Sequence, residues 1–136
     1  MHPTISRIEE AILSGKDDDI KGVLAEDVAF RPPTYFKTWR GRDAVAAVLG
    51  HVAHVFSDFR YRRKLGEDRD WALEFECKVG AFDAVGVDLL KLGANGLITE
   101  FEVVMRPYKT VGALREAMNE RVMRDPRFLK FKDALE

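Results

Sequence analysis

The stretch between Gly86 and Pro107 is the feature that most constrains the fold of this chain. Two apolar segments flank Asn95-Gly96, a pair that is typical of a tight turn because both residues tolerate positive φ. The two segments therefore predict a β-hairpin. A single carboxylate, Asp88, lies inside the first apolar segment. Such a group is either solvated on an outer face or enclosed in a pocket that shifts its pKa.

The rest of the chain predicts an α+β protein. Apolar residues at helical spacing indicate a first helix with Thr4 as N-cap and Gly15 at its end, a short helix after Asp17, and a third helix that Asp43 caps. Strands are expected at 28–31, 59–65, 71–79, 84–92 and 97–106, and a last helix at about 110–123. This order favours a strongly curved antiparallel sheet that wraps around the N-terminal helices and encloses a pocket.

Length and composition narrow the class of protein. The chain of 136 residues predicts one domain, 1–136, and its 46% apolar and 33% charged residues are typical of a soluble globular protein. A net charge of -1 gives no global attraction to nucleic acid, so the basic run at 60–64 is expected on a solvated strand face. Cys77 is the only cysteine, and no apolar run approaches a membrane span. We expect a cytoplasmic protein without nucleic-acid or membrane partners.

The order of elements, the Gly86-Val87-Asp88 segment and the final strand ending in Arg106-Pro107 resemble the nuclear transport factor 2-like superfamily, in its SnoaL-like and ketosteroid isomerase-like branch. The resemblance covers almost the whole chain and implies a cone-shaped fold with a cavity. This scaffold hosts enzymes, binding proteins and transport adaptors, so the fold alone does not name a reaction.

The resemblance assigns a role to one residue of this chain, and two other functional residues of the ketosteroid isomerases have no counterpart in it. Asp88 matches an aspartic acid of the ketosteroid isomerases. In those enzymes the apolar site keeps this carboxyl group protonated, and it donates a hydrogen bond to an oxyanion. The same alignment places Pro32 where those enzymes have their catalytic base, and proline accepts no proton. The tyrosine of their first helix is also missing, since no tyrosine precedes Tyr35.

Asp88 is therefore the candidate catalytic residue, and the alternative is a structural acid held by a helix residue or a backbone amide. His51, at the edge of the third helix's apolar stripe, is a weaker candidate that could partner Asp88 as a neutral base. Aromatic and apolar residues predicted to line the ligand pocket are Tyr35, Trp39, Phe56, Phe59, Tyr61, Trp71, Phe75, Phe101 and Met105. No metal-ligand cluster is visible, and we expect neither a metal nor another cofactor.

Two functions remain open. The first is a pocket for a small hydrophobic or carbonyl-bearing ligand, with isomerase- or cyclase-type proton transfer by Asp88. The second is a non-catalytic ligand-binding or protein-interaction module of the same fold. The mixed apolar and charged outer face of the sheet predicts a homodimer. Two phenylalanines, Phe128 and Phe131, are expected to dock either on their own domain or on the partner.

Overall fold

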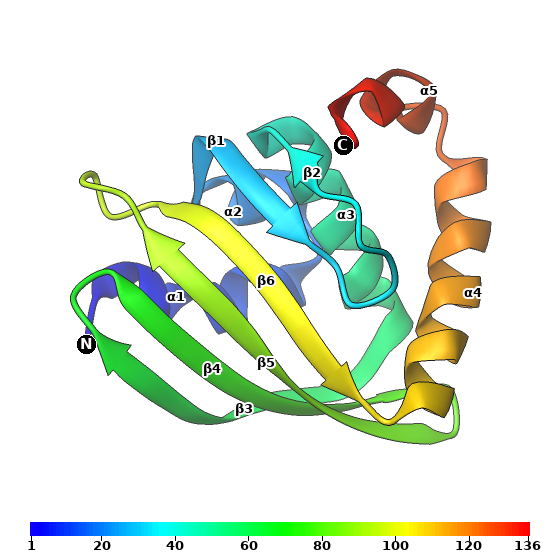
Figure 1. Ribbon diagram of the computed structural model, residues 1–136, viewed down its shortest axis with the longest axis horizontal. Coiled ribbons are helices and arrows are strands. Elements are labelled where there is room, and N and C mark those ends of the chain that lie inside the picture. Colours follow the sequence, from blue (N-terminus) through cyan, green and yellow to red (C-terminus); the bar gives the residue numbers. More distant parts are fainter.

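The computed structural model describes residues 1–136 as one curved six-stranded sheet with helices behind it and at one end (Figure 1). The helices are α1 (Pro3–Ser14), α2 (Asp17–Lys21), α3 (Arg42–Val55), α4 (Tyr108–Arg124) and α5 (Phe128–Phe131), followed by a 3-10 turn at Lys132–Ala134. The strands are β1 (Leu24–Arg31), β2 (Trp39–Arg40), β3 (Phe56–Glu67), β4 (Asp70–Val79), β5 (Phe82–Leu92) and β6 (Ile98–Arg106). The predicted α+β class and curved sheet are confirmed.

The sheet is mixed, which corrects the prediction of an entirely antiparallel one. Its strand order is β2-β1-β6-β5-β4-β3, and β1 runs parallel to β6. After β1 the chain crosses behind the sheet through α3 and starts β3 at the opposite edge, so the meander returns to β1 only with its last strand (Figure 1). Strand periodicity carries no information about this long-range pairing.

Two predicted helix caps are wrong. His2 caps α1, because its Nδ1 accepts a hydrogen bond of 3.1 Å from the Thr4 backbone N–H. Thr4 itself is buried, and its hydroxyl donates to the carbonyl of Gly96 in the β5–β6 connection. Gly41 precedes α3 with φ of 96°, and Asp43 lies in the first turn. A tertiary contact thus takes the threonine hydroxyl that local sequence assigns to capping.

The predicted hairpin of β5 and β6 is confirmed, but its turn is longer than two residues. The Gly93 N–H donates to the Leu97 carbonyl at 2.8 Å, and Asn95 Oδ1 accepts from the Leu97 N–H at 3.1 Å. Within Asn95-Gly96, Gly96 alone has positive φ, at 81°. The side-chain turn of Asn95 therefore replaces the type I′ geometry that the dipeptide favours.

The main core lies between the helices and the inner face of the sheet. It contains 20 buried residues, among them Ile5, Ile8, Val45, Leu90 and Phe101. Along β5 the burial alternates, so that Asp88 points inward with its neighbours on the same face. The strand's period of two thus places a carboxyl group among core side chains.

The outer face of the sheet pairs its charges and leaves some apolar side chains exposed. Arg60, Arg62 and Arg63 on β3 form ion pairs with Glu74 and Glu76 on β4. The basic run is thus balanced by acids on the neighbouring strand.

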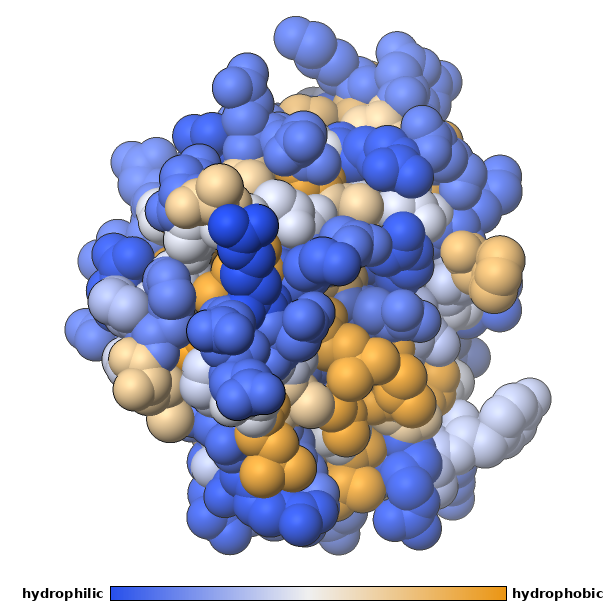
Figure 2. Space-filling model, turned by 60° about the vertical axis from the view of Figure 1, so that its left-hand side comes forward, coloured by the Kyte–Doolittle hydropathy of each residue, from blue (hydrophilic) through white to orange (hydrophobic).

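Apolar side chains also reach the surface. Leu65 and Val104 are each 55% exposed, and Figure 2 shows hydrophobic patches set among hydrophilic side chains on one face of the molecule. No helix of the protein combines the length and the hydropathy needed to cross a bilayer.

Candidate functional site

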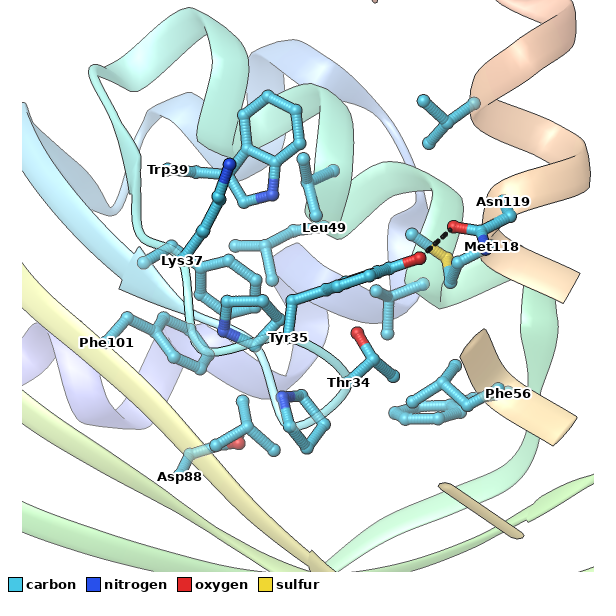
Figure 3. Close-up of a pocket in the computed structure, with 18 of the residues that line it drawn as sticks. Thr34, Tyr35, Lys37, Trp39, Leu49, Phe56, Asp88, Phe101, Met118 and Asn119 are labelled. Atoms are coloured by element: carbon cyan, nitrogen blue, oxygen red, sulfur yellow. Dashed lines mark hydrogen bonds between the residues drawn. The ribbon is translucent and has the colours of Figure 1, made fainter. Parts of the chain in front are cut away.

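A cavity of about 480 Å³ lies between the inner face of the sheet, α3, α4 and the segment that joins β1 to β2 (Figure 3). Its volume falls in the range of small-molecule sites, about 300–1,000 Å³. Its wall is mainly apolar and aromatic, with Phe30, Trp39, Leu49 and Phe101 among its members. An apolar wall of this kind favours a ligand with a hydrophobic body.

Asp88 is the only carboxylate in the cavity wall. Asp88 is only 4% exposed. The Tyr61 hydroxyl donates a hydrogen bond of 2.6 Å to Oδ2 of Asp88. Burial raises the pKa of Asp88 from 3.8 to about 7, and the hydrogen bond from Tyr61 opposes part of that shift. Near neutral pH the group is therefore available both as a proton donor and as a proton acceptor.

Tyr61 supports Asp88 from behind rather than facing the cavity. It lies on β3, where its backbone N–H donates to Glu9 of α1 at 3.0 Å and its ring meets Phe59 edge-on at 5.0 Å. Burial, followed by the nearby charge of Asp88, raises the pKa of Tyr61 well above its usual value. The phenol thus stays protonated and remains a hydrogen-bond donor to Asp88.

Most of the predicted pocket residues lie together on the cavity wall: Tyr35, Trp39, Phe56, Phe59, Phe75 and Phe101. Tyr61, Trp71 and Met105 do not, which corrects their assignment as lining residues. The indole N–H of Trp71 donates to the Asp68 carbonyl at 3.0 Å, and Met105 packs against a small cluster around Phe75. Strand spacing predicted an inward face but could not separate core from cavity.

His51 does not reach Asp88. Its Nε2 is 2.8 Å from Asp125 Oδ2, and its Nδ1 accepts a hydrogen bond of 3.0 Å from Arg121 Nε. Accepting at Nδ1 leaves the ring proton on Nε2, where it is donated to Asp125. His51 therefore links α3 to the end of α4 and is absent from the cavity wall. The weaker catalytic candidate of the sequence is a structural contact.

The mouth of the cavity contains residues that sequence reasoning missed. The Tyr35 hydroxyl donates to Asn119 Oδ1 of α4 at 2.8 Å, across the opening (Figure 3). Phe128 is buried and meets the Trp39 ring edge-on at 5.6 Å. Further lining residues outside the prediction include Thr34, Lys37, Val103, Met118, Val122, Lys132 and Leu135. The C-terminal segment thus docks on its own domain.

This docking is a long-range contact with little local signal. Thr38 and Glu136 exchange two backbone hydrogen bonds of 3.0 and 2.8 Å, which tie the chain's end to the β1–β2 segment. The only hint in the sequence was the pair of phenylalanines in an otherwise charged segment, Phe128 and Phe131. Their apolar rings needed a surface to cover, but nothing nearby in the sequence identified it.

Comparison with known proteins decides the family. Residues 5–101 match the SnoaL-like domain family. The chain belongs to the SnoaL-like family. It is 68% identical to a protein with a cystatin-like fold from Silicibacter pomeroyi DSS-3, with a TM-score of 0.98 and coverage of 100% of this chain and 96% of that one. The search of curated proteins gave no match.

Two further solved structures share the fold of this SnoaL-like domain. A steroid delta-isomerase from Pseudomonas aeruginosa is 32% identical, with a TM-score of 0.83 and coverage of 89% of this chain and 90% of that one. An NTF2-like protein from Burkholderia xenovorans LB400 is 20% identical, with a TM-score of 0.68 and coverage of 77% and 82%, and shows the shared fold alone. The predicted superfamily and branch are confirmed.

Proposed function

We propose that this SnoaL-like domain binds an apolar, carbonyl-bearing small molecule and that protonated Asp88 donates a hydrogen bond to the carbonyl oxygen. The observation that carries the proposal is a lone carboxyl group, with a pKa near 7, in the wall of an otherwise largely apolar cavity. A carboxyl group that is neutral at physiological pH is a strong donor to a developing oxyanion.

The geometry around Asp88 supports this role. Tyr61 occupies Oδ2, and Oδ1 receives no hydrogen bond from the protein. A proton on Oδ1 can therefore be offered to a ligand, while Tyr61 keeps the carboxyl plane in one orientation. No backbone N–H donates a hydrogen bond to the Asp88 carboxyl group. This argues against a purely structural acid, the alternative that the sequence left open.

The 32% identical structure named as a steroid delta-isomerase supports the choice of a carbonyl ligand. This chain lacks a second carboxylate for a proton transfer that uses two acid-base groups, because Asp88 is the only carboxylate in the cavity wall. Pro32 and Pro33 lie in that wall at the end of β1. Asp88 is thus the one carboxyl group available for a proton shuttle, first as acid and then as base. A ligand-binding module without turnover is the second candidate, and the single acid is what favours it.

The test is binding of 6-propionyl-2-dimethylaminonaphthalene, a fluorescent aryl ketone whose emission reports the polarity and hydrogen bonding of its carbonyl. We expect the affinity for the wild type to fall about tenfold per pH unit above about 7, since the donor ionises there. The Asp88→Asn variant, which does not titrate, should bind with an affinity that is flat between pH 6 and pH 9. Binding by the wild type that does not depend on pH, or no binding, would overturn the proposal.

The same two proteins separate catalysis from binding alone. A ketone with exchangeable α-hydrogens is incubated with protein in D₂O and followed by NMR. Exchange that is faster with the wild type than with Asp88→Asn supports proton transfer by Asp88. Equal rates, together with pH-dependent binding, favour the non-catalytic module. The predicted homodimer remains a separate proposal, which sedimentation equilibrium tests directly.

A further inference from the structure

The charges in the cavity wall are unevenly distributed. Besides Asp88, the wall contains two side chains that carry a charge at neutral pH, Lys37 and Lys132, and both are cationic. Lys37 precedes β2 and Lys132 follows α5, so two distant segments of the chain bring them to the same opening. The protein as a whole has a net charge of -1, so this local excess of positive charge is a property of the cavity.

Neither lysine has an anionic partner within the protein. The ion pairs formed by lysines are Lys21 with Asp43 and Lys78 with Asp83, and none of these residues is part of the cavity wall. Of the two acids that follow Lys132, Asp133 forms no ion pair and Glu136 pairs with Arg40. Two lysines of the cavity wall without an ion-pair partner are therefore available to an external anion.

A third cation strengthens the positive field at this opening. The guanidinium of Arg115 lies over the ring of Tyr35, 4.3 Å from its centre, and Tyr35 is part of the cavity wall. Arg115 takes part in no ion pair with an acid of the protein. The stacking holds the cation beside the mouth, where it adds to the attraction for an anion.

Asp88 and the Lys37 ammonium group lie in different parts of the cavity. Figure 3 shows Asp88 on the strand side of the cavity, whereas the Lys37 side chain extends away from it toward Trp39. Between them the wall is aromatic and aliphatic, with Phe101 and Leu49 among its members. The cavity therefore offers a hydrogen-bond donor at one end, an apolar middle and the ammonium group of Lys37 at the other end.

We infer that the ligand is an amphipathic anion, with a carbonyl group at Asp88, an apolar body in the middle and a carboxylate at Lys37 and Lys132. The inference depends on the proposed function for the placement of the carbonyl and adds the chemical class of the other end. A neutral hydrocarbon-like ketone would leave the ammonium groups without a partner. A carboxylate would gain ion pairs with these two exposed ammonium groups.

The test compares matched acids and amides that share one apolar ketone. The probes are 6-acetyl-2-naphthoic acid, its homologues with the carboxylate on an oxyacetic or oxybutyric tether, and the primary amide of each. Calorimetry at pH 6 is suitable, because Asp88 is then mainly protonated and does not repel the acid. We expect at least one acid to bind about tenfold tighter than its amide, and added salt to reduce the difference.

Substitutions of the lysines identify the source of that difference. The double variant with Lys37→Gln and Lys132→Gln should bind acid and amide equally, and each single variant should lose about half of the advantage on a logarithmic scale. Lys130→Gln is the matched control, since this exposed lysine lies two residues from Lys132 but outside the cavity wall. It should keep the wild-type preference, with a small loss from the change in net charge.

The outcomes keep the two proposals apart. If the amides bind in a way that depends on Asp88 but no acid binds more tightly, the anionic end is wrong and the proposed function stands. An acid preference that survives in the double variant likewise overturns the role of the lysines. If neither acids nor amides bind, both proposals are wrong.

Discussion

The Tyr61 hydroxyl lies 2.6 Å from Oδ2 of Asp88 and is the only protein group that donates a hydrogen bond to this buried carboxyl. Tyr61 and Asp88 come from β3 and β5, the first and third strands of the meander. Burial raises the pKa of Asp88, and the phenol's hydrogen bond lowers it. The balance of these two effects sets the protonation of the candidate site near neutral pH.

Removing the phenol should therefore raise the pKa of Asp88. In Tyr61→Phe the carboxylate loses its only donor while the site stays buried, so we expect an apparent pKa above the value of about 7. Carboxyl-carbon NMR with Asp88→Asn as the assignment reference measures it. Tyr108→Phe is the control, because Tyr108 is 94% exposed. An unchanged or lower pKa in Tyr61→Phe would contradict the role given to the hydrogen bond.

Asp88 should also make the protein less stable at alkaline pH than at acid pH. Its folded pKa of about 7 exceeds the ordinary 3.8, so the folded state holds a proton that the unfolded state has released. The free energy of unfolding should then fall as pH rises from about 4 to about 7 and level off above that. Asp88→Asn should lack this fall and be more stable than the wild type at pH 8, by about 4 kcal/mol. Urea unfolding at pH 5 and pH 8 tests it, and parallel curves for the two proteins would contradict it.

Asp125 should have the opposite effect on how the free energy of unfolding depends on pH. Hydrogen bonds from Arg127 and His51 hold the pKa of this carboxyl far below its usual range. The stabilisation is present above about pH 4 and is lost as the pH falls below it. Asp125→Asn should lower the free energy of unfolding at pH 7 by about 1–3 kcal/mol, because His51 and Arg127 lose a charged partner. Asp43→Asn, at a mainly exposed ion pair with Lys21, should change it by less than about 1 kcal/mol.

That pair of variants also tests the attachment of the C-terminal segment. Asp125 precedes α5, whose Phe128 closes part of the cavity wall. Weakening the contact should speed the release of a bound ketone, which stopped-flow fluorescence measures. A slower or unchanged release in Asp125→Asn would show that this contact does not control access to the cavity.

The inward position of Asp88 could be predicted from the sequence because it depends on local patterns. Alternation along 84–92 and the turn at Asn95-Gly96 are short-range signals, and the resemblance to the SnoaL-like branch added the cavity. The partner of Asp88 was not predictable. Tyr61 was one of several aromatic residues at strand spacing, and only the register of β3, β4 and β5 brings its hydroxyl to the carboxyl group.

The mouth of the cavity escaped prediction for the same reason. Lys37 and Lys132 lie 95 positions apart in the sequence, and no periodicity relates them. Their proximity to one opening depends on α4 and α5 folding back over α3, a contact that the His51–Asp125 pair helps to hold. His51 was a catalytic candidate because it lies at the edge of the apolar stripe of its helix. The side chain points instead toward a helix whose placement the sequence does not reveal.

Gly86 provides the last prediction, because it sets the space beside Asp88. It lies two residues before Asp88 on the same inner face of β5 and is buried. A Cβ at this position would lie 2.7 Å from the Val104 carbonyl oxygen and would also collide with the Phe75 ring. The ring can shift only within a packed wall, and the carbonyl belongs to the β5–β6 ladder, so neither can give way cheaply. Gly86→Ala should therefore lower the free energy of unfolding by about 1–3 kcal/mol. Gly112→Ala is the control, since an added Cβ on α4 meets nothing within 4 Å and alanine favours a helix. Equal stability of the two variants in urea would mean that the sheet beside Asp88 is looser than its contacts indicate.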